Sequence, residues 1–174
     1  MMAMESLTRT YDNPVSRLIQ FVVVGRLRAP MDAAGAEYEQ RIARMADLRV
    51  DEVSAEAVQH GNAQVFRKEG ERMRGKIVQG AHVVALDVRG RAPKSSEALA
   101  AWMGQRLESP KPTAFLIGGA IGIDPALVDE ADERMSLGPL TLPHQLARVV
   151  LGEQVYRALA DLAGHPYPHA GGGR

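Results

Sequence analysis

The chain has 174 residues, no cysteine and a formal net charge of +0. This length predicts one domain that removes roughly 70% of its unfolded surface from water. A content of 45% hydrophobic and 24% charged residues excludes a mostly disordered chain. The lack of cysteine excludes a disulfide scaffold, a thiolate zinc site and a thiol nucleophile.

The N-terminal segment, residues 1–17, is polar. It lacks the apolar core of about 7–15 residues that a secretory signal needs, so we expect an N-terminal extension followed by a single domain at 18–174. No apolar run approaches the roughly 18 residues that span a bilayer. We therefore expect no membrane partner, and the lack of cysteine fits the reducing compartment of a cytoplasmic protein.

Strand and helix patterns alternate along the chain. Extended patterns predict strands at 18–24, 48–53, 83–88 and 114–117, and a short extended piece at 136–142. Helical patterns predict helices at 31–46, at 64–78, from Ser95 or Ser96 to about Leu107, from Pro125 with Asp124 as N-cap, and from Pro143 to about Ala163. This alternation predicts an α/β domain with a mostly parallel sheet.

The last predicted helix is apolar on two sides. One side carries Leu146, Val149 and Val150, and the opposite side carries Leu151, Val155, Leu159 and Leu162. Such a helix must be covered twice. The second cover is either another copy of the chain, which predicts a homodimer, or a second layer of the same domain.

Three predicted loops follow strands, at 87–90, 118–122 and 136–144, and ligands of open parallel sheets bind at such loops. The glycine loop at 118–122 is not a dinucleotide fingerprint, because Ala120 stands where a glycine is needed, and no Gly-Lys-Ser/Thr follows for a P-loop. It either lets backbone groups approach a ligand closely or is a plain turn from a strand to a helix.

Polar side chains gather in the C-terminal third, where the candidates for recognising a polar, anionic partner are His144, Arg148, His165, Tyr167 and His169. They form no metal motif, because no His-Glu-x-x-His and no well-placed carboxylate accompany them. Glu153 and Arg157 have the spacing of an ordinary surface ion pair. The charged run at 67–76 is typical of a solvated helix face.

Four ordered motifs carry a resemblance to a known family: Phe-Leu-Ile-Gly-Gly at 115–119, Leu-Thr-Leu-Pro-His at 140–144, Glu-Gln-Val-Tyr-Arg-Ala at 153–158 and His-Pro-Tyr at 165–167. Over about 18–169 the chain resembles the ribosomal large subunit methyltransferase H family. These are SPOUT-class enzymes that methylate N3 of a pseudouridine in the helix 69 region of 23S rRNA within the assembled ribosome.

The resemblance implies an α/β domain with a C-terminal trefoil knot, a homodimer, and S-adenosylmethionine as methyl donor without a metal. The donor-binding positions that it implies are Leu86, Gly118, Leu137, Gly138, Pro139, Leu140, Thr141 and Leu142. The implied catalytic residues are Arg157, His169, His165 and Arg148, and the implied substrate-binding residues are His144, Tyr156 and Tyr167.

This chain departs from the family pattern at a few positions. Ala120 and Ile121 stand where the family has Pro and Glu, Gly138 stands where it often has Ser, and Pro168 precedes the final histidine.

Two other classes of function use the same loops. One is a non-catalytic α/β module that binds a nucleotide or metabolite. The other is a metal-dependent phosphate-ester hydrolase, which the absence of a carboxylate cluster in the sequence disfavours.

Overall fold

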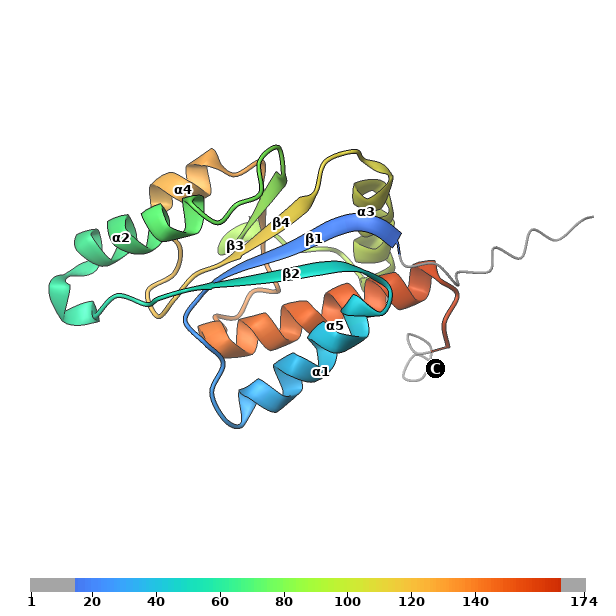
Figure 1. Ribbon diagram of the computed structural model, residues 1–174, viewed down its shortest axis with the longest axis horizontal. Helices are drawn as coiled ribbons and strands as arrows, with labels where there is room; N and C mark the ends of the chain where they lie inside the picture. The colour runs from blue at the N-terminus through green and yellow to red at the C-terminus, as the bar shows by residue number, and fades with distance from the viewer. Residues whose placement is uncertain (1–14, 167–174) are drawn as a thin grey trace, which may run out of the picture.

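A computed structural model describes residues 15–166, which form a five-stranded sheet with helices on both faces (Figure 1). The strands are β1 (Val15–Val24), β2 (Ala46–Val53), β3 (His82–Arg91), β4 (Thr113–Ile117) and β5 (Glu133–Met135). Their order is β2-β1-β4-β3-β5, and every neighbouring pair is parallel. The predicted parallel α/β sheet is confirmed.

The helices are α1 (Met31–Ala43), α2 (Asn62–Arg74), α3 (Ser96–Glu108), α4 (Pro125–Glu130) and α5 (His144–Leu162), with a short 3-10 helix η1 (Val58–His60) before α2. Helices α1, α3 and α5 cover one face of the sheet, and α2 and α4 cover the other (Figure 1). None of the helices within residues 15–166 combines the length and the apolar character needed to cross a membrane.

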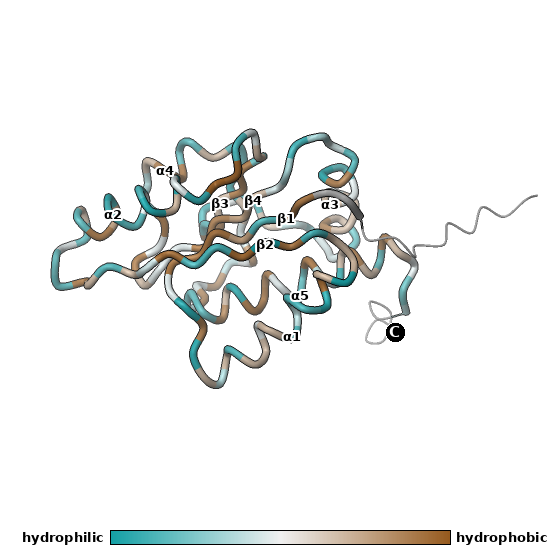
Figure 2. The backbone as a smooth tube through the Cα atoms, in the orientation of Figure 1, coloured by the Kyte–Doolittle hydropathy of each residue, from teal (hydrophilic) through white to brown (hydrophobic). Residues whose placement is uncertain are grey.

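Alternating residues of the strands supply the two cores. In β1, Ile19, Phe21 and Val23 pack with α1, α3 and α5, whereas Val22 and Val24 pack on the side of α2 and α4. Both faces of the central strands are therefore apolar, as parallel strands covered on both sides require. The hydrophobic colour of Figure 2 gathers along these strands.

Local capping signals are confirmed at two helices. Ser95 accepts a hydrogen bond from the backbone N–H of Ala98 at 3.1 Å, and Asp124 accepts one from Ala126 at 3.1 Å, with Pro125 at the first helical position. Both side chains pair backbone donors that the first turn leaves unpaired.

Two expectations for the loops are wrong. Residues 136–142 form no strand, because β5 ends at Met135 and the chain turns at once: the Ser136 hydroxyl donates to the Gly138 carbonyl at 2.6 Å, and Gly138 has a φ of 135°. Residues 87–90 are not a loop but the end of β3, which runs to Arg91 with an irregular register against β5. In addition, β1 begins at Val15 rather than at Leu18.

Helix α5 lies between α1 and α3 on the sheet. Leu151, Val155 and Leu159 are buried in the core, and Val149 faces Gly35 of α1. Part of the apolar surface on the two sides of α5 is therefore buried within the same chain. The homodimer, the trefoil knot and the division at residue 17 stay predictions.

Candidate functional site

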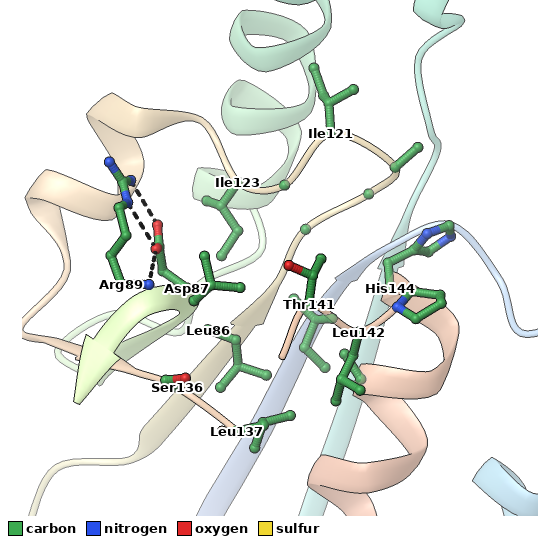
Figure 3. Close-up of a pocket in the computed structure, with 18 of the residues that line it drawn as sticks. Leu86, Asp87, Arg89, Ile121, Ile123, Ser136, Leu137, Thr141, Leu142 and His144 are labelled. Atoms are coloured by element: carbon green, nitrogen blue, oxygen red, sulfur yellow. Dashed lines mark hydrogen bonds and ion pairs between the residues drawn. The ribbon is translucent and has the colours of Figure 1, made fainter. Parts of the chain in front are cut away.

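A cavity of about 750 Å³ opens where β3, β4 and β5 end (Figure 3). Its wall comes mainly from three segments, residues 86–89, 117–123 and 135–144, with Phe66 of α2 and Ala147 of α5 at its borders. Ligands of open parallel sheets bind at the carboxyl ends of the strands, and pockets for small molecules measure roughly 300–1,000 Å³. The cavity has both the place and the size of a ligand site.

The glycine loop forms one wall because its backbone doubles back on itself. A Cβ on Gly118 would lie 2.4 Å from the carbonyl carbon of Gly122 and 2.6 Å from the backbone nitrogen of Ile123. Gly122 has a φ of 91° and donates its N–H to the Gly119 carbonyl at 3.1 Å. Position 118 requires glycine because the backbone of residues 122 and 123 leaves no room for a Cβ. Position 122 requires glycine because its φ is positive.

The segment after β5 forms the opposite wall. Leu137 and Leu142 converge with Leu86 of β3 to make an apolar surface in the cavity (Figure 3). Leu140 also lines the cavity, yet it is 76% exposed. The loop thus presents aliphatic side chains together with the backbone of Gly138.

An ion pair forms the polar edge of the cavity. Arg89 donates to Asp87 from Nε at 3.0 Å, from Nη2 at 2.9 Å and from its backbone N–H at 2.8 Å (Figure 3). These hydrogen bonds hold the pKa of the Asp87 carboxyl below its usual value. The sequence contains a signal for this ion pair, because residues at i and i+2 of a strand lie on the same face.

The structure brings together most of the predicted donor-binding residues. Those that line the cavity are Leu86, Gly118, Leu137, Gly138, Leu140, Thr141 and Leu142, and His144 at the start of α5 joins them. Pro139 lies in the same segment but not in the cavity wall. Sequence reasoning missed Phe66, because it lies in a helix that is mostly hydrophilic.

Arg148, predicted as catalytic, is 7% exposed and lies away from the cavity wall. Its Nε donates to Glu39 at 2.8 Å and its Nη1 donates to Glu52 at 2.8 Å. Burial alone would lower the pKa of Arg148, but the two carboxylates raise it above its usual value. In this structure Arg148 ties α5 to α1 and β2.

Tyr156 and Arg157 lie in the second half of α5, and neither belongs to the cavity wall. Arg157 donates from Nε to Glu153 at 3.0 Å, and the Tyr156 ring lies 6.4 Å from that of Tyr38. His165 follows the C-terminal end of α5, far from His144 at its start. Predicted residues Tyr167 and His169 lie outside the described residues.

Within residues 15–166, no group of three or more His, Cys, Asp or Glu side chains is arranged to hold a metal ion. The cavity wall instead offers aliphatic side chains, glycine backbone and the Asp87–Arg89 pair. Such a wall suits an organic ligand with apolar faces and polar edges.

The family profile described as "Predicted SPOUT methyltransferase" matches residues 18–169. The chain belongs to the SPOUT methyltransferase family. The matched range contains every element from β2 to α5 and the whole cavity wall of this SPOUT methyltransferase.

Two curated relatives extend the likeness over nearly their whole length. The ribosomal RNA large subunit methyltransferase H of Nitrosospira multiformis is 40% identical over 150 residues, which cover 84% of this chain and 96% of the relative. That of Listeria monocytogenes serotype 4b is 42% identical over 156 residues, which cover 86% and 98%.

A solved structure supports the fold. The probable methyltransferase from Bordetella pertussis Tohama I superposes with a TM-score of 0.52 at 13% identity, over 83% of this SPOUT chain and 95% of that one.

Proposed function

We propose that this SPOUT methyltransferase transfers a methyl group from S-adenosylmethionine to N3 of a pseudouridine in 23S ribosomal RNA. The observation that carries the proposal is the cavity at the carboxyl ends of β3, β4 and β5, which gathers nearly all the motif residues of the donor site. The two relatives that match over 96% and 98% of their length are named ribosomal RNA large subunit methyltransferases, which supports ribosomal RNA as the substrate. Ribosomal RNA as substrate also supports a cytoplasmic location.

The residues present fit the donor. Leu86, Leu137 and Leu142 offer apolar surface for the faces of an adenine ring. The glycines at 118 and 138 leave backbone groups open to the polar edges of a ligand. When bound, the donor supplies an activated methyl group on a positively charged sulfur, so the protein needs mainly to orient the acceptor.

Loss of the N3 proton makes the pseudouridine nucleophilic and spreads negative charge over its two flanking carbonyl oxygens. We propose that the Arg157 guanidinium stabilises this charge. We also propose that a histidine of the C-terminal segment, His165 or His169, accepts the proton, since histidine titrates near neutral pH. His144 lines the cavity and is proposed, with Tyr156 and Tyr167, to contact the RNA.

The length of α5 supports a site built from two copies of the chain. His144 lies at the cavity, and the 19 residues of α5 carry the chain about 27 Å away before His165 is reached. Residue 169 is only three residues beyond Pro166, a reach of at most about 11 Å. We therefore infer a homodimer in which the C-terminal segment of one subunit serves the cavity of the other.

The direct test is methyl transfer to ribosomes that lack this modification. Incubation with a labelled donor should place the label on N3 of a pseudouridine in 23S RNA, and assembled ribosomes should be far better substrates than a short stem-loop. If the protein binds the donor but no label appears in the RNA, the alternative function, a non-catalytic binding module, is favoured.

Mixing two inactive variants tests the composite site. Leu140→Arg disables the cavity and Arg157→Ala disables the proposed charge stabiliser, so each homodimer should be inactive. After subunit exchange, a heterodimer contains one intact cavity that faces one intact Arg157, and activity should return. Continued inactivity of the mixture would show that each chain uses its own Arg157.

A further inference from the structure

Glu69 is a buried carboxylate on α2, a helix whose residues are mostly hydrophilic (Figure 2). It is 3% exposed, and its Oε1 accepts the backbone N–H of Glu56 at 2.8 Å. Its Oε2 is buried without a hydrogen-bond partner, the one such side-chain atom found in the part of the chain that the structure describes. Burying a charged oxygen without a partner costs stability, so its position calls for a functional reason.

The carboxylate lies directly behind the wall of the cavity. A Cβ on Gly119 would lie 3.1 Å from Glu69 Oε2 and 3.4 Å from Oε1, so the carboxylate occupies the space beside this glycine. Gly119 lines the cavity, whereas Glu69 does not. The glycine backbone therefore stands between the carboxylate and a ligand, with no side chain to increase the separation.

No cation is bonded to Glu69 among the described residues. Arg72 of the same helix donates to Glu56 and to the Ser54 carbonyl, and His144, at the start of α5, interacts with Glu69 only electrostatically through space. The pKa of Glu69 is raised above its usual value, chiefly by burial and further by the Glu56 carboxylate. The hydrogen bond from the Glu56 N–H and the charges of Arg72 and His144 act in the opposite direction without cancelling the rise. When Glu69 is ionised, its field is thus only partly neutralised inside the protein.

We propose that Glu69 determines ligand specificity by making the cavity prefer a cationic ligand over its neutral counterpart, S-adenosylmethionine over S-adenosylhomocysteine. This inference rests on the proposed function. The two molecules share the adenosine and amino-acid groups and differ in the methyl group and positive charge on sulfur. A negative charge in a medium of low polarity attracts a cation without touching it. The same preference promotes release of the demethylated product after transfer.

Isothermal titration calorimetry on the full chain tests the preference. Glu69→Gln keeps an oxygen for the Glu56 N–H and removes the charge. It should weaken S-adenosylmethionine about tenfold relative to S-adenosylhomocysteine, the effect of unit charges roughly 10 Å apart at an effective dielectric of about 20. Sinefungin, which carries an ammonium group in place of the sulfonium, should follow S-adenosylmethionine.

Glu71→Gln is the matched control, because it removes the same charge from the same helix. The Glu71 side chain is 59% exposed and pairs with Arg67, so its charge is screened by water. This variant should bind both ligands as the natural chain does. Thermal unfolding should show Glu69→Gln at least as stable as the natural chain at neutral pH, since a desolvated charge has been removed.

The dependence on pH gives a second measurement. The difference in ligand preference between the natural chain and Glu69→Gln should narrow as the pH is lowered from neutrality, because Glu69 becomes protonated. The difference between the two proteins is the readout, because every other ionisable group is common to both.

Two results would overturn the inference: an unchanged ratio of the two affinities in Glu69→Gln, whether or not both ligands bind more weakly, or a difference between the two proteins that does not vary with pH. Each of these leaves the proposed function standing. If the natural chain binds neither ligand, the proposed function and the inference fail together.

Discussion

Replacing Gly118 by alanine tests whether the backbone of the glycine loop shapes the cavity that we propose for the donor. The new Cβ would lie 2.4 Å from the Gly122 carbonyl carbon, whereas ordinary contacts begin near 3.4 Å. The obstacle is backbone, so the two arms of the loop must separate by about 1 Å. Overpacking of this kind costs about 1–3 kcal/mol. If this free energy is lost from the binding of the donor, the donor affinity drops about 5- to 150-fold.

Calorimetric titration with S-adenosylmethionine measures this loss, and urea unfolding separates it from global destabilisation. The matched control is Gly75→Ala at the end of α2. Gly75 has a φ of −65°, and its added Cβ would lie 3.6 Å from the nearest heavy atom, so we expect unchanged binding. Equal donor affinity for the two variants would refute the reasoning that close backbone packing at Gly118 shapes the donor site.

Three further predictions address stability and the cavity. Arg148→Ala should lower the free energy of unfolding by about 2 kcal/mol, because a buried guanidinium loses its charge-assisted hydrogen bonds to the partly exposed Glu39 and Glu52. Arg67→Ala at an exposed pair should cost less than about 0.5 kcal/mol, and urea titration compares the two variants. Hydrogen bonds from Arg72, His60 and Lys68 lower the pKa of Glu56 from 4.5 to about 2, so its stabilising contribution is present above pH 4.5 and disappears as the pH falls towards 2. Glu56→Gln should therefore be less stable than the natural chain at neutral pH, with a gap that closes in acid, and a pH-independent gap would contradict this account. Leu140→Arg should weaken donor binding at least tenfold without loss of stability, because residue 140 is 76% exposed in the cavity wall; unaltered affinity would show that the donor binds elsewhere.

Much of the fold was predictable because its signals are local. The apolar run at 114–117, the caps at Ser95 and Asp124, and the glycines of the loop each act within a few residues. The order of the strands was not predictable, since β4 lies between β1 and β3 through pairings that are distant in the sequence. The charged residues that end β3 also concealed a strand that runs on to Arg91.

In the candidate site, too, local motifs were predictable and contacts between distant parts of the sequence were not. The motif residues at 137–142 were found because their order is distinctive, and the structure places nearly all of them at one cavity. The surroundings of Arg148 and Glu69 could not be read from the sequence. The i,i+4 spacing places Arg148 on the same helix face as His144, but it does not show that Arg148 pairs with Glu39 and Glu52, which are distant in the sequence. A charged run looks solvated until the rotation of α2 shows that Glu69 faces inward.

The aliphatic side chains left in water at the mouth of the cavity have a thermodynamic consequence. Leu140 and Val88, exposed by 76% and 58%, both line it. Any ligand or subunit that covers them removes apolar surface from water, so association should show a negative heat-capacity change. Its enthalpy should therefore become more favourable on warming, even where the affinity hardly changes.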